Sequence, residues 1–324
     1  MTIALWALAF AAIRAALKSF DVGELSVLRL TLAALVLLAA APLASLRLPA
    51  RRDIPRLLAC GLTGMAGYQL LLNAGEKSVT AGTASILVNT GPVFVALLAT
   101  RFLGERLTAR GWLGIALGFG GALVIAVGAG GGVSVSSGVL LVLGAAVAQA
   151  TFFVVQKPLL ARYSAFEITT YSMVSGAVML LPLAPSLPGA VTHASGDALA
   201  AVGFLALGAS AVGFFSWAYA NARLEVTRAA SALYAVPAVA ILVGWIWLRE
   251  LPSIVSVTGG AIALSGALLA STGRRAAPVT GRPIRSGTAP ARPPAEPAPG
   301  PGGTPPAPQD TGAAVRPARQ CRRR

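Results

Sequence analysis

The chain has few residues of the kinds that build disulfide frameworks, metal centres or nucleophilic catalytic sites. Its 324 residues include 2 cysteines and 1 histidine. Cys60 lies in an apolar segment and Cys321 near the C-terminal end, so the sequence offers no disulfide framework, CxxC motif or metal-ligand spacing. The single His193 leaves a metal site or a histidine-based triad without its other parts. We therefore expect no cofactor, no metal and no catalytic residues.

Charge is scarce as well. Only 11% of the residues are charged, 56% are hydrophobic and the mean hydropathy is +0.74. A large soluble globule needs more polar surface than this composition supplies. The composition therefore predicts an all-α integral membrane protein with the lipid bilayer as its solvent.

Ten apolar runs have roughly the length that crosses a bilayer. The segment from Trp6 to Leu17 has the length of a signal-peptide core, but no basic segment precedes it, so we expect a retained span. The ten predicted spans are Thr2–Leu17, Leu25–Leu43, Ile54–Leu72, Ala81–Leu103, Trp112–Val127, Val139–Val155, Ile168–Leu187, Leu199–Ala220, Ala229–Leu248 and Val255–Ala270.

The second half of the chain repeats the first at a nearly constant offset. The segments SILVNTGPVFVALLATRFLGE and ASALYAVPAVAILVGWIWLRE place Pro92 145 residues before Pro237 and Glu105 145 residues before Glu250. Each half contains five predicted spans. An odd number of spans makes the second copy insert upside down, so we expect two inverted five-helix repeats, at residues 1–127 and 138–272.

The distribution of cations predicts the orientation. With the N-terminus in the cytoplasm, the outer loops receive only Lys18, Lys77 and Arg249. The excess of cations on the other side matches the positive-inside rule, so we expect a multi-pass protein of the inner or plasma membrane with both termini in the cytoplasm. The cations of the cytoplasmic loops are Arg47, Arg51, Arg52, Arg56, Arg101, Arg106, Arg110, Lys157, Arg162, Arg223 and Arg228.

The composition changes abruptly at residue 273. Residues 274–324 are rich in proline and arginine, have only Glu296 and Asp310 as acids and contain few large apolar residues. Such a segment buries too little to offset its conformational entropy, so we predict a disordered cytoplasmic tail over residues 273–324. Two interpretations stay open, a dispensable tail and a polybasic segment that adheres to anionic lipid. Basic charge without a folded module or stacking aromatics does not predict nucleic-acid binding.

The two proline-centred segments and the spans that follow them resemble the EamA domain of the drug/metabolite transporter superfamily, in two copies from Trp6 to about Ala270. The resemblance implies a ten-helix transporter, usually an exporter of amino acids or other small metabolites, with a small-molecule solute as its partner. The alternative is a membrane-embedded enzyme or lipid-handling protein without transport activity, which would need clustered acidic or histidine residues near the interface. The single His193 weighs against that alternative.

Large polar or aromatic side chains in the middle of small-residue spans are candidates for a solute path, because a polar group at mid-depth is costly unless it faces a cavity or another helix. The alternative is that these polar side chains only form hydrogen bonds between packed helices. Proline kinks a helix, so Pro92 and Pro237 are candidate hinges. The candidate solute-binding residues are Tyr68, Gln69, Asn89, Gln149, Trp217 and Tyr234.

Three groups of residues leave two interpretations each. Glu105 and Glu250 stand at span ends beside arginines, which favours capping and interfacial ion pairs over proton coupling. Arg14 and Arg29 lie deeper, where snorkelling to the interface competes with binding of a solute anion. Small-residue faces either seat helices within one bundle or join two chains, so we expect a monomer or a homodimer. These faces contain Gly111, Gly114, Gly118, Gly259 and Ala263.

Overall fold

A computed structural model describes residues 1–44, 46–102, 106–129, 136–223, 233, 236–249, 252–272 and 274–275. All of them belong to one compact unit, Met1–Pro278. The predicted disordered tail lies outside the described residues, apart from residues 274–275.

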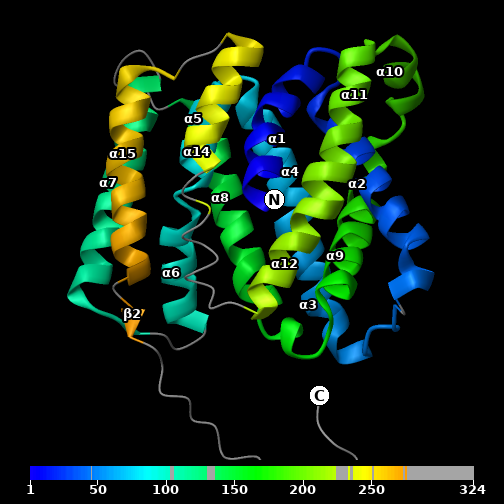
Figure 1. The fold of residues 1–324 in the computed structure, drawn as a ribbon, viewed down its shortest axis with the longest axis horizontal. Coiled ribbons are helices and arrows are strands. Elements are labelled where there is room, and N and C mark those ends of the chain that lie inside the picture. Colours follow the sequence, from blue (N-terminus) through cyan, green and yellow to red (C-terminus); the bar gives the residue numbers. More distant parts are fainter. Residues whose placement is uncertain are drawn as a thin grey trace, which may run out of the picture. The chain divides into compact units, whose positions relative to one another are not determined.

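The first half is a set of helices joined by short connections (Figure 1). Its third span runs as an α-helix, a π-helical turn and a second α-helix, and its fourth is broken in the middle. The elements are α1 (Thr2–Ala16), α2 (Val22–Ala39), η1 (Ala41–Ala44), η2 (Arg51–Asp53), α3 (Ile54–Cys60), η3 (Gly61–Gly67), α4 (Tyr68–Glu76), α5 (Ala81–Val88), α6 (Gly91–Phe102), β1 (Arg106–Leu107) and α7 (Ala109–Ala129).

The second half repeats this order of helices. Its third span again contains a π-helical segment, η6, which begins 144 residues after η3. The elements are α8 (Ser137–Gln156), η4 (Leu159–Ala161), α9 (Ala165–Leu180), η5 (Leu181–Leu183), α10 (Leu187–His193), α11 (Gly196–Phe204), η6 (Leu205–Val212), α12 (Gly213–Arg223), α14 (Val236–Val243), η7 (Gly244–Leu248), α15 (Ile254–Thr272) and β2 (Arg274–Arg275).

Six helical stretches are long and apolar enough to cross a membrane, and four shorter apolar helices accompany them. Together they coincide with the ten predicted spans. Two ends differ from the prediction, because proline stops the α-helix early. Pro42 follows the end of α2 and Pro182 the end of α9, so both predicted spans leave the α-helix early, with short 3-10 turns at Ala41–Ala44 and Leu181–Leu183.

Corresponding helices of the two halves begin in the same way. Asp21 with Glu24, and Ser164 with Glu167, form capping boxes at the first turns of α2 and α9. The Glu24 carboxylate accepts from the Asp21 backbone N–H at 2.8 Å, and the Glu167 carboxylate accepts from the Ser164 backbone N–H at 2.7 Å. This bond satisfies a donor that the helix leaves open. The two glutamates therefore serve helix initiation.

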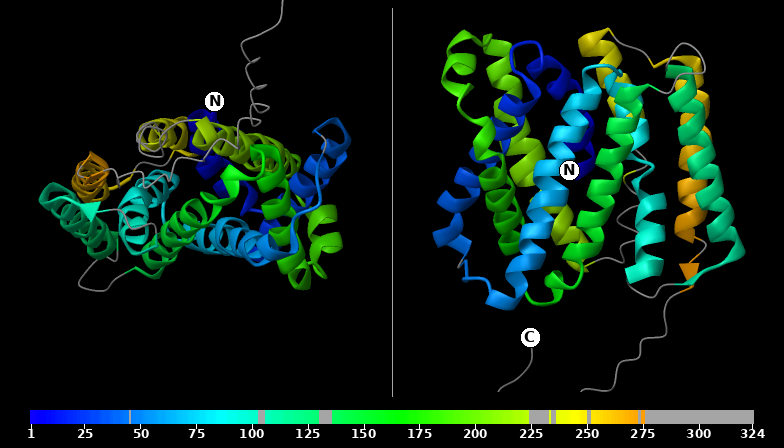
Figure 2. Two further views of the ribbon diagram at one scale, coloured as in Figure 1. Left: turned by 90° about the horizontal axis from the view of Figure 1, so that it is seen from below. Right: turned by 180° about the vertical axis from the view of Figure 1, so that it is seen from behind.

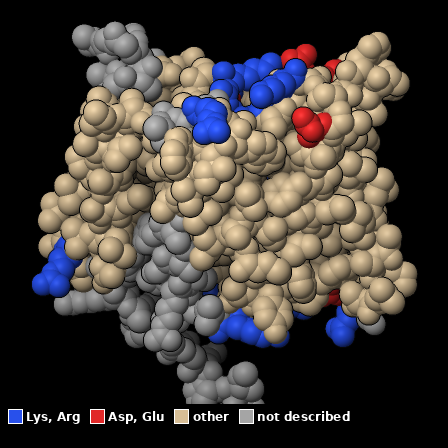
Figure 3. All heavy atoms as spheres, turned by 45° about the horizontal axis from the view of Figure 1, so that its top comes forward, with Lys and Arg blue, Asp and Glu red and all other residues tan. Residues whose placement is uncertain are grey.

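The helices of the two halves are interleaved. In Figure 1, α1 ends near the top, where α2 begins, whereas α8 ends near the bottom, close to the start of α9. Helices α4 and α8, from different halves, lie side by side (Figure 2). In Figure 3, lysines and arginines gather at two opposite edges with a wide band of mostly uncharged surface between them. Such a band is typical of a surface that faces lipid.

The small-residue faces of α7 and α15 pack against each other within the chain. A side chain on Gly114 would overlap the backbone of Ala270, and one on Gly121 would overlap that of Ala263. Glycine at these positions therefore permits a close backbone approach. Beside this pair, residues Arg106–Leu107 of β1 pair antiparallel with Arg274–Arg275 of β2. These faces thus seat helices within one bundle, and a homodimer remains a prediction without a contact assigned to it.

Candidate functional site

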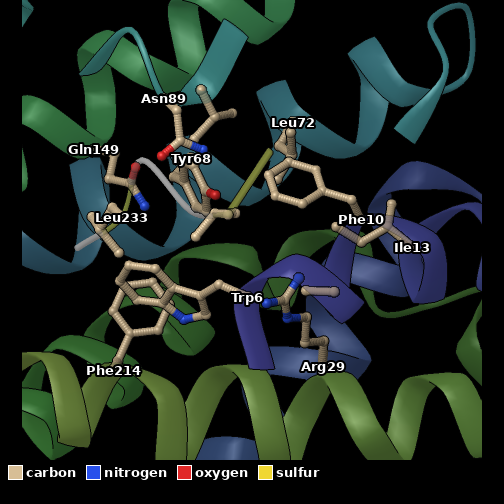
Figure 4. Close-up of a pocket in the computed structure, with 13 residues that line it drawn as sticks. Trp6, Phe10, Ile13, Arg29, Tyr68, Leu72, Asn89, Gln149, Phe214 and Leu233 are labelled. Atoms are coloured by element: carbon tan, nitrogen blue, oxygen red, sulfur yellow. The ribbon is translucent and has the colours of Figure 1, made fainter. Parts of the chain in front are cut away.

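A small pocket lies where helices of both halves converge (Figure 4). The space open to the centre of a water molecule is about 30 Å³. That is room for about two water molecules, so the pocket is nearly closed in this conformation. Its lining is mostly apolar, with a few polar groups and one cation. The lining residues are Trp6, Ala9, Phe10, Ile13, Arg29, Tyr68, Leu72, Val88, Asn89, Gln149, Phe214, Leu233 and Val236.

The pocket contains residues from matching positions of the two halves. Trp6 and Gln149 are 143 residues apart, and both line it. Val88 and Leu233 are 145 residues apart, and both line it as well. Corresponding helices therefore converge on this space from both halves.

The broken fourth span positions Asn89. Helix α5 ends at Val88 and α6 begins at Gly91, and the Asn89 amide nitrogen donates to the Ser85 carbonyl oxygen at 2.8 Å. Pro92 has no N–H for the carbonyl of Val88 four residues earlier, which explains the break. Because its nitrogen is engaged by the helix, Asn89 can present its side-chain oxygen to the pocket.

The two π-helical segments lie next to the pocket. Tyr68 and Gln69 follow η3 directly, whereas Ala209 and Ser210 belong to η6. The Trp6 indole nitrogen donates to the Ala209 carbonyl oxygen at 3.1 Å, and its ring packs on Gly213, which has no side chain to keep it away. Local π-helical turns are frequent at functional sites, because they shift the faces that side chains occupy.

An aromatic cluster forms one wall. The Trp6 ring centroid is 5.2 Å from that of Phe214 and 5.5 Å from that of Trp217, and the Phe153 centroid is 5.0 Å from that of Trp217. These spacings are those of interacting aromatic pairs. Figure 4 shows Asn89, Gln149 and Tyr68 grouped on one side of the pocket, with the rings of Trp6 and Phe214 opposite.

The structure brings together three of the predicted site residues and places two others behind them. Tyr68, Asn89 and Gln149 line the pocket. Gln69 is fully buried and contacts Arg29, and Trp217 stands behind Trp6. Tyr234 lies outside the described residues, as do Glu105 and Glu250.

The candidate hinges lie close to this region. Pro92 is the second residue of α6, just after the break, and Pro237 is the second residue of α14. The residue four positions before Pro237 is Leu233, which lines the pocket.

The Arg29 and Arg14 side chains lie in different surroundings. The Arg29 side chain does not snorkel, since it is 2% exposed and lines the pocket. Arg14 lies outside the pocket, beside Lys18 and Lys77, and donates to the Glu76 backbone oxygen at 2.6 Å. The sequence named Arg29 only as a choice between snorkelling and binding of a solute anion, and it did not single out Trp6 or Phe214.

Two wider hollows do not combine such groups. One is lined mainly by apolar residues around Leu98 and Phe102, with Arg56 and Thr151 at its edge, and the other is lined by residues around Leu57 and Val174. The space in them that is open to the centre of a water molecule is about 460 and 570 Å³. Neither is lined by residues from matching positions of the two halves, as the small pocket is.

Residues 1–127 and 136–272 match the EamA-like transporter family. A protein of Streptantibioticus cattleyicolor named as a probable terminal-alkyne amino-acid exporter is 44% identical over 83% of this chain and 90% of its own length. An uncharacterized transporter of Bacillus subtilis, YdfC, is 35% identical over 82% of this chain and 87% of its own length.

A solved crystal structure is similar in fold. It has a TM-score of 0.60 and 21% identity, and the match covers 84% of this chain and 94% of that one. The matched family consists of transporters rather than enzymes, which removes the support for a membrane-embedded enzyme. The resemblance noted in the sequence is confirmed: this multi-pass membrane protein belongs to the EamA-like transporter family.

Proposed function

We propose that the protein is a secondary exporter of a small amphipathic solute, an amino acid or a close chemical relative of one. The two halves act as inverted repeats that rock around a shared pocket and open it to either side in turn. The observation that carries this proposal is the pocket itself, which residues from matching positions of both halves line.

The chemistry of the pocket supports an amphipathic solute. Apolar and aromatic side chains such as Phe10 and Phe214 would surround an apolar part, and Tyr68, Asn89 and Gln149 would replace water around a polar part. The similar protein of Streptantibioticus cattleyicolor is named for amino acids with an alkyne side chain, which have both parts. The small volume is consistent with an occluded conformation that must widen to admit the solute.

Each predicted site residue receives a role in this proposal. Tyr68, Asn89 and Gln149 would contact the solute, and Trp217 would support the Trp6 wall. Gln69 would hold Arg29. We assign Tyr234 a solute contact from the sequence alone, because it is the counterpart of Asn89.

Pro92 and Pro237 would let the fourth and ninth spans bend as the pocket opens. Because each frees a carbonyl in the preceding turn, the helix on either side of it can tilt without breaking a hydrogen bond. We place the protein in the cell membrane with both termini in the cytoplasm, on the basis of the cation distribution.

Flux in proteoliposomes tests the function. Vesicles with purified protein should exchange a labelled amphipathic amino acid, and cells that express the protein should lose such a compound to the medium. Asn89→Ala and Gln149→Ala should lower the flux about tenfold, as expected for the loss of one or two hydrogen bonds to a bound solute. Trp217→Ala should also lower it, with a larger risk to folding because the ring is buried.

His193→Ala is the matched control, since His193 is exposed in α10 and does not line the pocket. Its flux and its membrane yield should equal those of the unchanged protein. Pocket variants that insert normally and transport at the original rate would show that these polar side chains only join helices. A protein that moves none of a panel of amphipathic amino acids would disprove the proposed function.

A further inference from the structure

Arg29 is a buried cation inside the pocket. It lies in the middle of the apolar helix α2, is 2% exposed and lines the same space as Trp6 and Tyr68. A charge at this depth is costly unless another charge or a set of hydrogen bonds compensates it. The partners of Arg29 therefore show how much of its charge the protein itself compensates.

The direct partners of Arg29 are neutral. Its Nε donates to the Ser210 hydroxyl oxygen at 2.7 Å, and its Nη1 donates to the Gln69 side-chain oxygen at 2.8 Å. In the described part of the chain, none of the ion pairs within 4.0 Å includes Arg29. The Glu76 carboxylate attracts Arg29 only from a greater distance. The cation is thus fixed in direction by one residue of each half but not neutralised at contact distance.

The guanidinium group keeps donors for another acceptor. It carries five N–H groups in a rigid plane, and the two hydrogen bonds above use one on Nε and one on Nη1. Nη2 makes no hydrogen bond to the described residues, nor is it among their fully enclosed unpartnered atoms. Figure 4 shows the guanidinium group turned toward the pocket beside Trp6. Such a planar pair of donors matches the two oxygens of a carboxylate.

Among the described residues, the second half adds no further cation to the pocket. The counterpart of Arg29, 143 residues later, is Ser172, which is fully buried. The remaining polar lining of the described pocket is Tyr68, Asn89 and Gln149, which are neutral side chains. The described pocket therefore has one positively charged group. The aromatic wall and the amide oxygens would contact the remaining, uncharged or cationic parts of a bound solute.

We infer that Arg29 binds the carboxylate of the solute and makes the pocket selective for monocarboxylates with a short apolar chain. This inference rests on the proposed export function and names the group that the site recognises. Ser210 and Gln69 act as positioning residues that aim the guanidinium group. A solute without a carboxylate would leave a buried cation uncompensated, which is why the site discriminates against it.

Binding to the purified full chain in detergent tests this inference. Thermal unfolding is followed at rising concentrations of L-propargylglycine, of its methyl ester and of 4-pentynoate, which has the carboxylate but lacks the amine. The unchanged protein should bind both carboxylates at least about tenfold more tightly than the ester, as expected for a charge-assisted hydrogen-bonded pair. Arg29→Gln should bring the three affinities to within about twofold. Arg29→Lys keeps the charge but not the planar pair of donors and should retain part of the preference.

Arg110→Gln is the matched control, because it removes an exposed cation at the start of α7 and should leave the preference unchanged. A purely structural role of Arg29 would weaken all probes equally, so an unchanged ratio in Arg29→Gln would overturn the inference. If the variants do not fold, the unchanged protein still decides, since equal affinity for acid and ester excludes carboxylate recognition.

Proteoliposome flux separates this inference from the proposed function. Transport of an amino acid by the unchanged protein, with no effect of Arg29→Gln on the acid-to-ester ratio, leaves the function standing and the role of Arg29 disproved. Absence of any transport, together with tight binding of 4-pentynoate that Arg29→Gln abolishes, supports the carboxylate site and disproves export of amino acids.

Discussion

Two contacts join the halves of the bundle at its opposite ends, and they involve corresponding segments. At one end, Asp53 before α3 accepts from the Arg162 guanidinium group at 2.8 Å and from the Tyr163 hydroxyl at 2.9 Å. The Tyr163 oxygen also accepts from the Ala50 backbone N–H at 3.0 Å. The Asp53 side chain is only 3% exposed.

At the other end, the same positions hold smaller groups. Ser19, the counterpart of Arg162 at an offset of 143, lies 3.4 Å from the Ser195 hydroxyl oxygen and accepts from the Ser195 backbone N–H at 3.5 Å. Both distances are at the limit of a hydrogen bond, and the contact is exposed. Asp197, the counterpart of Asp53 at an offset of 144, has no ion pair among the described residues.

The difference predicts which end opens first. Hydrogen bonds to a charged group contribute about 1.5–3 kcal/mol each, whereas a long, exposed contact between neutral groups contributes well under about 1 kcal/mol. The end at Asp53 therefore holds the stronger of the two polar contacts between the halves. In the proposed alternating-access mechanism, the end with the stronger contact should open less readily, so changes at the two ends should have unequal effects.

The largest effect concerns which side each end faces, because labelling is all-or-none. In a chain without Cys60 and Cys321, an impermeant maleimide applied to intact cells should label cysteines at Lys77 and His193 but not at Arg51 or Ala161. This result would assign the Asp53 end to the cytoplasm, as the cation distribution predicts. Labelling of the Arg51 and Lys77 positions from the same side would contradict both the ten spans and the inverted repeat.

Asp53→Asn should open the firm end. The substitution removes the charge that Arg162 and Tyr163 hold, so labelling of a cysteine at Leu57, one turn along α3 and 4% exposed, should become about 10 to 100 times faster. The rate is measured in inside-out vesicles. Asp21→Asn is the matched control, because Asp21 forms an exposed ion pair with Lys77 at 3.0 Å, and it should change the rate less than about twofold. Equal labelling rates in the Asp53→Asn and Asp21→Asn variants would contradict the idea that the Asp53 end holds the stronger contact.

Ser19→Arg should strengthen the weak end. It copies the Arg162 position opposite Asp197, and an exposed ion pair of about 1 kcal/mol would slow opening and lower the transport rate about fivefold. Adding Asp197→Asn to this variant should restore the original rate, whereas Asp197→Asn alone should have little effect. A slow double variant would show that arginine obstructs this end by its size instead.

Ser195→Ala should change the transport rate less than about twofold, because the contact it removes is long and exposed. Flux in proteoliposomes at matched protein density measures it. A loss as large as that of Asp53→Asn would mean that the Ser19 end is closed by more than the hydroxyl contact.

The smallest effect is expected from the tail. A chain that stops after Arg275 should insert and transport at the original rate, since the composition of the remainder cannot support a packed core. Stopping after Gly273 instead also removes the pairing of Arg274–Arg275 with Arg106–Leu107, so the two truncations separate the β pairing from the tail. Lost flux with normal insertion in the longer truncation would assign the tail a part in transport.

Much of this fold was predictable from the sequence. The thickness of the bilayer sets the length of an apolar span, so the ten apolar helices could be found from length and hydropathy without a structure. The constant offset identified the two halves, and the same kind of offset relates Trp6 to Gln149, which the pocket brings together. Pro92 correctly marked an interruption in the fourth span.

Only the tertiary structure decided which side of each helix faces the pocket. Helix α2 has hydrophobic residues on all of its faces, and lipid and protein core attract such residues equally, so periodicity could not tell whether Arg29 points inward. The π-helical segments η3, which precedes Gln69, and η6, which contains Ser210, likewise depend on packing rather than on a local sequence signal. The sequence determines how many helices cross the membrane, because water excludes their apolar side chains. Contacts between the helices determine where each polar side chain finally lies.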